Sequence, residues 1–154
     1  MTDKELERDE RFMALALAEA EEAYRAGEIP VGAVIVTKGG RVIARGHNLT
    51  ETLTDVTAHA EMMAITSACN NLGGKYLPDC TLYVTVEPCA MCAGALGWSQ
   101  IGRIVYGASD PKRGFESYYD GSRSPLHPKT RVTAGVLAED CAALMTSFFK
   151  RLRR

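Results

Sequence analysis

The sequence lacks any apolar run long enough to cross a membrane. One of the longest, PVGAVIV, has seven residues, whereas a membrane-spanning helix needs about 20. The first ten residues, MTDKELERDE, are charged and contain none of the apolar stretch of a secretory signal. We therefore expect a cytoplasmic protein with no membrane partner.

Cysteine is scarce and its number, five, is odd, which argues against a disulfide framework. Repeats, low-complexity tracts and interdomain linkers are also missing. With 154 residues, 46% of them hydrophobic and 24% charged, the composition is that of a globular protein with enough chain to bury a core. We expect one domain over residues 1–154. We also expect Cys69, Cys80 and Cys141 to behave as small buried apolar residues.

The net charge of −1 conceals an uneven distribution. Residues 1–102 hold 8 Lys/Arg and 14 Asp/Glu, whereas residues 103–154 hold 10 and 5. A positive half of this kind can face nucleic acid. An unevenly charged solvated surface explains the same counts equally well.

Hydrophobic periodicity predicts alternating helices and strands. Apolar residues at helical spacing, followed by Gly27, predict a first helix over 8–26. The other predicted helices cover 57–69 with Thr57 as N-cap, a short stretch opening at Pro88, and 138–152. Apolar and β-branched runs predict strands over 31–37, 41–48, 80–86, 103–108 and 131–137, and residues 108–130 are expected to be irregular. The order predicts an α/β fold with helices on both faces of a sheet.

Two motifs place chemically active side chains at the starts of two predicted helices. TAHAEM holds His59 and Glu61, and EPCAMC holds Cys89 and Cys92. The two cysteines share one face of a first helical turn, where the helix N-terminus stabilises the thiolate form. His59 and Glu61 are two positions apart and would point roughly 200° apart in a regular helix, which suits one ligand and one non-ligand.

One histidine and two cysteines make three zinc ligands. Structural zinc sites are normally closed by four ligands, whereas catalytic sites keep one position for water. Glu61 would then be the base that takes a proton from this water. A redox pair or half of a zinc knuckle would explain the cysteines alone, but H-x-E followed by P-C-x-x-C is the signature of zinc deaminases.

With these motifs the chain resembles the bacterial tRNA-specific adenosine deaminases of the cytidine-deaminase-like superfamily. The matching blocks span nearly the whole chain: EIPVGAV, GHN, TAHAEM, TLYVTVEPCAMCAGAL, RIVYGASDPK, GVLAEDCAAL and FFK. The resemblance implies a three-layer α-β-α fold with a five-stranded mixed sheet. It also implies one zinc ion per subunit on His59, Cys89 and Cys92, with Glu61 as proton shuttle. Zinc-bound hydroxide would attack C6 of the wobble adenosine in a tRNA anticodon stem-loop, giving inosine and ammonia.

The resemblance further implies a set of substrate contacts: Ile29, Pro30, Val31, Asn48, Ala60, Glu87, Asp110, Lys112 and Phe149. Plainer roles are open for several of them, since Asn48 is also a turn residue and Glu87 also suits a helix cap. Phe149 is the better candidate of the two consecutive phenylalanines, because Phe148 falls on the apolar stripe of the last helix. Further candidates for phosphate contacts are Arg113, Lys150, Arg151, Arg153 and Arg154, although the tail cations also suit a helix C-terminus.

Relatives of this kind usually form homodimers in which both chains shape each site. In the stretch MCAGALGW, Gly94, Ala95 and Gly97 permit the close approach of another helix, and Trp98 suits either a subunit interface or packing in the core. The segment 113–130 departs from the Gly/Ala-rich pattern of many relatives.

Two other functions share features with this sequence. A free nucleobase or nucleoside deaminase, guanine deaminase-like or cytosine/cytidine deaminase-like, has the same two motifs. A non-catalytic zinc-stabilised binding protein is opposed by Glu61 and by the missing fourth ligand. GASDPK, FFK and the positive C-terminal half favour an RNA substrate.

Overall fold

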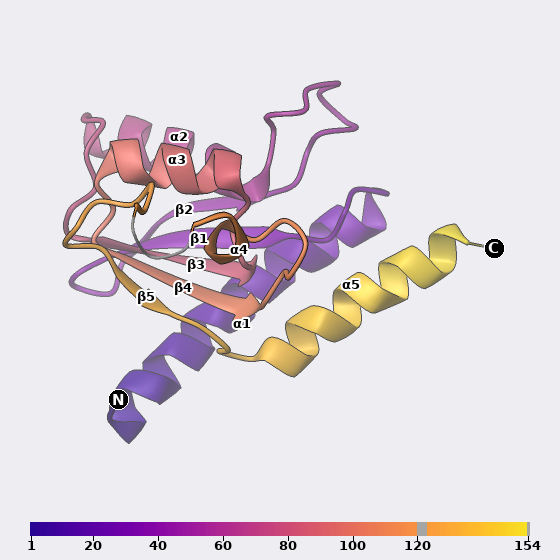
Figure 1. Ribbon diagram of the computed structural model, residues 1–154, viewed down its shortest axis with the longest axis horizontal. Coiled ribbons are helices and arrows are strands. Elements are labelled where there is room, and N and C mark those ends of the chain that lie inside the picture. The colour runs from indigo at the N-terminus through magenta and orange to yellow at the C-terminus, as the bar shows by residue number, and fades with distance from the viewer. Residues whose placement is uncertain (120–122, 154) are drawn as a thin grey trace.

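A five-stranded sheet separates two pairs of helices in the computed structural model, which describes residues 1–119 and 123–153 (Figure 1). The strands are β1 (Gly32–Thr37), β2 (Val42–His47), β3 (Cys80–Val86), β4 (Arg103–Ala108) and β5 (Arg131–Thr133). Their order across the sheet is β2-β1-β3-β4-β5. Strand β1 is antiparallel to β2 and β3, whereas β3, β4 and β5 run parallel. The predicted mixed sheet is therefore confirmed.

Helices cover both faces of the sheet, as expected (Figure 1). Helices α2 (Ala60–Leu72) and α3 (Ala90–Ser99) lie on one face, and α1 (Asp3–Arg25) and α5 (Ala138–Leu152) lie on the other. Side chains alternate along a strand, so Ile35 packs with the first pair and Val34 with the second. A short helix, α4 (Phe115–Tyr118), lies between β4 and β5 in the chain. In the described part of the chain, no helix is long and apolar enough to cross a membrane.

The start of α2 differs from the prediction. The helix begins at Ala60 with His59 as its N-cap, not at Thr57. Thr57 does not cap the helix because its amide and its hydroxyl both donate to the carboxylate of Asp55. At the other end the helix continues to Leu72 and stops at Gly73, whose φ of 73° is readily adopted by glycine.

The start of α3 is also later than predicted, because Pro88 lies outside the helix. Cys89 has extended backbone angles and is the N-cap, and the carbonyl oxygen of Pro88 accepts a hydrogen bond from the Phe115 amide at 2.8 Å. That contact joins the turn before α3 to the start of α4, a helix inside the segment predicted to be irregular. The turn therefore serves a tertiary contact as well as a helix start.

Two further predicted boundaries are wrong. Helix α1 begins at Asp3 because Thr2 and Glu5 form a capping box. The last strand ends at Thr133, four residues before the predicted end, because the amides of Gly135 and Val136 both donate to the carbonyl of Tyr106. The chain turns there through Gly135, at a φ of 84°.

Glycine 32 lets α1 lie directly on β1, and we expect Gly32→Ala to destabilise the fold. A Cβ at this position would lie 2.1 Å from the carbonyl oxygen of Ala16, a backbone atom that moves only if the helix moves. The free energy of unfolding in urea should fall by about 3 kcal/mol. Gly39→Ala is the control, because a Cβ there meets nothing within 4 Å, and its effect should stay within about 0.5 kcal/mol. Equal effects of the two substitutions would contradict this account of the packing.

Candidate metal centre and substrate cavity

The three predicted zinc ligands come together at one edge of the sheet. His59 precedes α2, Cys89 precedes α3, and Cys92 lies in the first turn of α3. His59 Nδ1 lies 3.7 Å from Cys89 Sγ and 3.5 Å from Cys92 Sγ. The ligand atoms of the three residues all lie within 4.8 Å of one another.

These separations fit a tetrahedral zinc ion. Zinc bonds of about 2.0–2.1 Å to nitrogen and 2.3 Å to sulfur, at tetrahedral angles, hold the two atoms about 3.5 Å apart. Within residues 1–119 and 123–153, no fourth His, Cys, Asp or Glu belongs to the group. The donor set is therefore that of a catalytic zinc site with one position left for water.

The cysteines have the electrostatic surroundings of metal ligands. A hydrogen bond from the Cys92 thiol and the neighbouring His59 outweigh burial and lower the pKa of Cys89 to about 4. The bond to Cys89, together with burial, raises the pKa of Cys92. The surroundings thus favour the thiolate form of Cys89, and a coordinated metal deprotonates its thiol ligands outright.

Glu61 lies at the second position of α2, with only 3% of its surface exposed. Burial, assisted by the negative charge of Cys89, raises the pKa of Glu61 to about 7. The estimate of roughly 200° between His59 and Glu61 does not apply, because His59 has extended backbone angles outside the helix. Both side chains consequently line the same cavity.

This substrate cavity has a volume of about 760 Å³ and lies at the carboxyl ends of β3 and β4. Its size is typical of sites for small ligands. The predicted substrate contacts that line it are Ile29, Val31, Asn48, Ala60, Glu87, Asp110, Lys112 and Phe149. Pro30 is buried and does not line the cavity.

One wall of the cavity is held by two residues, Asn48 and Glu28. Asn48 was a predicted substrate contact, whereas the sequence analysis gave Glu28 no role. Asn48 Nδ2 donates to the carbonyl of Ile29 at 3.3 Å, and its Oδ1 accepts from the Thr50 amide at 3.1 Å. Each of the two polar atoms of Asn48 therefore has one contact within the chain and one hydrogen-bonding capacity left for a ligand. The buried carboxylate of Glu28 accepts bonds from the amides of Glu51 and Thr52 and from the Thr52 hydroxyl.

Those hydrogen bonds hold the loop after β2 in place. Burial disfavours the charge of Glu28, but the bonds from Thr52 and from the two amides outweigh it and lower the pKa of Glu28. A charged residue next to the apolar stretch IPVGAV was the only sign of this role in the sequence.

The opposite wall depends on Glu87. One carboxylate oxygen accepts from the Asp110 amide and the other accepts from the Glu116 amide, both at 3.0 Å. Gly114 leaves room for this carboxylate, since a Cβ there would lie 2.2–2.4 Å from its atoms. Glu87 therefore joins the turn that carries Cys89 to the loop over 110–116.

The rim of the cavity carries cations and one aromatic ring. Asp110 accepts hydrogen bonds from the amides of Lys112 and Arg113, which folds the turn and leaves both cationic side chains exposed. Phe149 is 39% exposed and Phe148 only 2%, so the predicted difference between them is confirmed.

The predicted tail cations differ in their surroundings. Lys150 and Arg153 are exposed. Arg151 donates to the carbonyl of Tyr24 at 3.3 Å and lies over the Tyr24 ring, so it also packs α5 against α1. Arg154 lies outside the described residues.

Comparison with known proteins agrees with this site. The family described as "Cytidine and deoxycytidylate deaminase zinc-binding region" matches residues 6–108. The tRNA-specific adenosine deaminase of Bacillus subtilis (strain 168) is 44% identical over 148 residues, which cover 95% of this chain and 91% of that protein.

Two solved structures have the same fold. One comes from studies of A-to-I editing by tRNA:A34 deaminases at the wobble position of transfer RNA. It matches with a TM-score of 0.81 and 46% identity, over 87% of this chain and 98% of that chain. The guanine deaminase from Nitrosomonas europaea matches with a TM-score of 0.77 but only 26% identity, over 90% of this chain and 83% of that chain. The chain belongs to the tRNA-specific adenosine deaminases, within the zinc-binding cytidine and deoxycytidylate deaminase family.

Proposed function

We propose that this protein converts the wobble adenosine of a tRNA anticodon to inosine by hydrolytic deamination. The observation that carries the proposal is the buried carboxylate of Glu61, which lines the same cavity as the open three-ligand metal centre. A closed structural zinc site needs neither the carboxylate nor the cavity. We assign one zinc ion per subunit to His59, Cys89 and Cys92.

Bound zinc would supply the positive charge that makes water nucleophilic at neutral pH. Glu61 takes a proton from the attacking water and delivers it to N1 of adenine as the new bond to C6 forms. Glu61 then moves the second proton to the exocyclic amino group, the C6–N bond breaks, and ammonia leaves. Its burial favours this role, because burial raises the pKa of the Glu61 carboxyl group toward neutrality, where a group exchanges protons readily in both directions.

An RNA substrate is supported by the relatives and by the cavity rim. Relatives in Bacillus subtilis, Streptococcus pyogenes and Haemophilus influenzae that are 43–45% identical over 94–96% of this chain are tRNA-specific adenosine deaminases. A guanine deaminase from Bacillus subtilis is 42% identical but covers only 71% of this chain, and the one from Nitrosomonas europaea is 26% identical. Lys112 and Arg113 suit phosphates beside the flipped base, and Phe149 suits stacking. We assign Ile29, Pro30, Val31, Asn48 and Ala60 to the binding of the base and ribose, Pro30 by fixing its neighbours.

We also propose that the chain is a single domain that acts in the cytoplasm as a homodimer. Both apolar clusters share the central sheet, which supports one domain over 1–154. Trp98 on α3 is 86% exposed, so core packing does not explain it. Met91 and Ala95 lie on the same helical face, and Gly94 has open space beside it, which together suit a second copy of the chain.

The first test offers zinc-loaded protein an A-wobble tRNA transcript, free adenosine, guanine and cytosine in parallel. We expect inosine at the wobble site, measured with ammonia release, and no turnover of the free compounds. Glu61→Gln should lower the rate by at least about 100-fold while metal analysis still finds zinc. Turnover of a free base with untouched tRNA would favour the guanine deaminase-like or cytosine deaminase-like alternative. Full activity of Glu61→Gln would remove Glu61 from the mechanism.

A second test concerns Glu87 as a positioning residue. In Glu87→Gln the amide NH₂ faces one of two backbone N–H groups that need an acceptor, so the 110–116 loop should lose its anchor. We expect KM for tRNA to rise about tenfold, kcat to change less, and zinc content to stay unchanged. Gly114→Ala should reproduce the effect by displacing the same carboxylate. The control is Glu21→Gln on the exposed face of α1, and parallel behaviour of Glu87→Gln and this control would refute the role.

A third test concerns the dimer. Trp98→Glu should convert the protein to a monomer in light-scattering measurements at concentrations where the wild type is dimeric, because a charge would replace a desolvated ring. The control is Leu6→Glu, which places the same charge at an exposed apolar residue of α1. A dimer that survives Trp98→Glu would place the interface elsewhere.

A further inference from the structure

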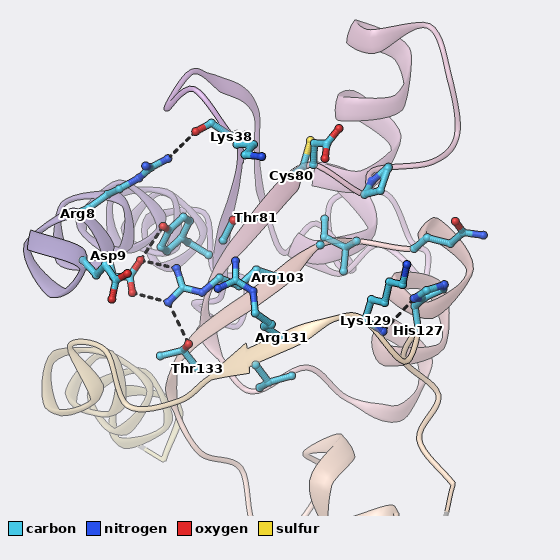
Figure 2. Close-up of a pocket in the computed structure, with 18 of the residues that line it drawn as sticks. Arg8, Asp9, Lys38, Cys80, Thr81, Arg103, His127, Lys129, Arg131 and Thr133 are labelled. Carbon is cyan, nitrogen blue, oxygen red and sulfur yellow. Dashed lines mark hydrogen bonds and ion pairs between the residues drawn. The ribbon is translucent and has the colours of Figure 1, made fainter. Parts of the chain in front are cut away.

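A second cavity, which we call the cationic cavity, lies at the opposite end of the parallel strands from the metal centre. Figure 2 shows the residues that line it. It has a volume of about 710 Å³ and lies at the amino ends of β3, β4 and β5. The length of a six-residue strand, roughly 20 Å, separates it from the substrate cavity. Nothing in the proposed deamination uses it.

An ion pair between Asp9 and Arg103 lines the cationic cavity. Asp9 is 1% exposed and accepts hydrogen bonds from the Tyr83 hydroxyl at 2.8 Å and from Arg103 at 2.8 and 2.7 Å. Arg103 also donates to the Thr133 hydroxyl at 3.0 Å (Figure 2). The charge of Arg103 is therefore balanced, and its guanidinium is held in one orientation.

Arg131 lies beside this pair without a counter-ion. It is the register partner of Arg103 on the neighbouring strand, and the two side chains lie alongside one another in Figure 2. Adjacent like charges on neighbouring strands destabilise a sheet, and both oxygens of Asp9 are already bonded to Arg103. In the part of the chain that the structure describes, Arg131 forms no ion pair.

Three more cations line the same cavity: Arg8, Lys38 and Lys129. Across residues 1–119 and 123–153, none of them forms an ion pair, and Arg8 donates instead to the carbonyl of Lys38 at 3.3 Å. Besides Asp9, the acids that line the cavity are Glu5 and Asp79. Glu5 accepts from the Thr2 amide in the capping box. When the Asp9–Arg103 pair is left out, four cationic side chains (Arg8, Lys38, Lys129 and Arg131) and two acidic ones (Glu5 and Asp79) line the cavity. The cationic side chains therefore exceed the acidic ones by two.

We propose that the cationic cavity binds phosphate groups, with Arg131 and Lys129 as their principal ligands. A concave surface with surplus positive charge concentrates anions. Phosphate matches the paired N–H groups of arginine, and lysine adds a point charge. The phosphates can belong to the RNA backbone outside the anticodon arm, a source that rests on the proposed function, or to a small free phosphate compound, which does not.

The RNA source is tested by binding of full-length A-wobble tRNA and of its isolated anticodon stem-loop. The variant is Lys129→Ala with Arg131→Ala in the zinc-loaded protein, and anisotropy is measured at several salt concentrations. We expect Kd for full-length tRNA to rise about tenfold and the slope of log K against log salt to become shallower by about 2. Binding and deamination of the isolated stem-loop should not change.

The control removes the same charge elsewhere. Arg45→Ala with Lys75→Ala substitutes two exposed cations that line neither cavity, and tRNA binding should stay within about twofold of the wild type. Equal weakening by both double variants would show a non-specific effect of net charge and overturn the proposal. Thermal unfolding of both double variants should be measured to check that each one is folded.

The small-molecule source is tested by calorimetric titration with inorganic pyrophosphate, which carries no base to enter the substrate cavity. Binding by the wild type that disappears in the Lys129/Arg131 variant, with tRNA affinity unchanged, would assign the cavity to a free phosphate compound. The proposal is overturned if pyrophosphate does not bind and the variant binds tRNA like the wild type. If the wild type neither binds nor edits tRNA, the proposed function fails, and the titration still decides the cavity.

Discussion

The candidate metal centre depends on the positions of helices α2 and α3. Their N-termini lie close enough together for residues from both to hold one metal ion. His59 and Cys89 are both N-caps, and neither uses its side chain to cap its helix. Both helix N-termini direct positive potential at this point, which favours thiolate and an anionic transition state. The sheet holds the two starts together, because α2 packs on β2 while α3 connects the parallel strands β3 and β4. The buried Glu61 depends on the same convergence.

The fold and the convergence of His59, Glu61, Cys89 and Cys92 could be predicted because their signals are local. Apolar periodicity defines the long helices, and the spacing within HAE and PCxxC places the reactive groups. Thr57 misled the prediction for a local reason too, since Asp55 competes for its hydroxyl. Glu87 was predicted only as a substrate contact or a helix cap, and Glu28 was given no role. Their roles as loop anchors could not be predicted, because their partners lie 22–29 positions away in the chain and are mostly backbone amides without a side-chain signature. The family's residues pointed to the substrate cavity, but no pattern in the sequence pointed to the cationic cavity.

The charge split between the two halves of the chain also takes a different meaning in three dimensions. Arg103 counts toward the positive half, but Asp9, from the negative half, neutralises it across 94 positions of sequence. Four other cations of the positive half lie at two places: Lys112 and Arg113 line the substrate cavity, and Lys129 and Arg131 line the cationic cavity. The charge count therefore shows that residues 103–154 hold an excess of cations, but it does not show on which surfaces of the folded protein these cations lie.

The two loops that form opposite walls of the substrate cavity are each held by a buried carboxylate that accepts hydrogen bonds from main-chain amides. Glu28 and Glu87 bind the backbone of their loops, and a side chain at Gly114 would collide with the carboxylate of Glu87. A library that randomises exposed loop residues such as Lys112 and Arg113 would leave these anchors in place. The architecture therefore lends itself to directed evolution of base and sequence preference, provided that the two acids and Gly114 are kept constant.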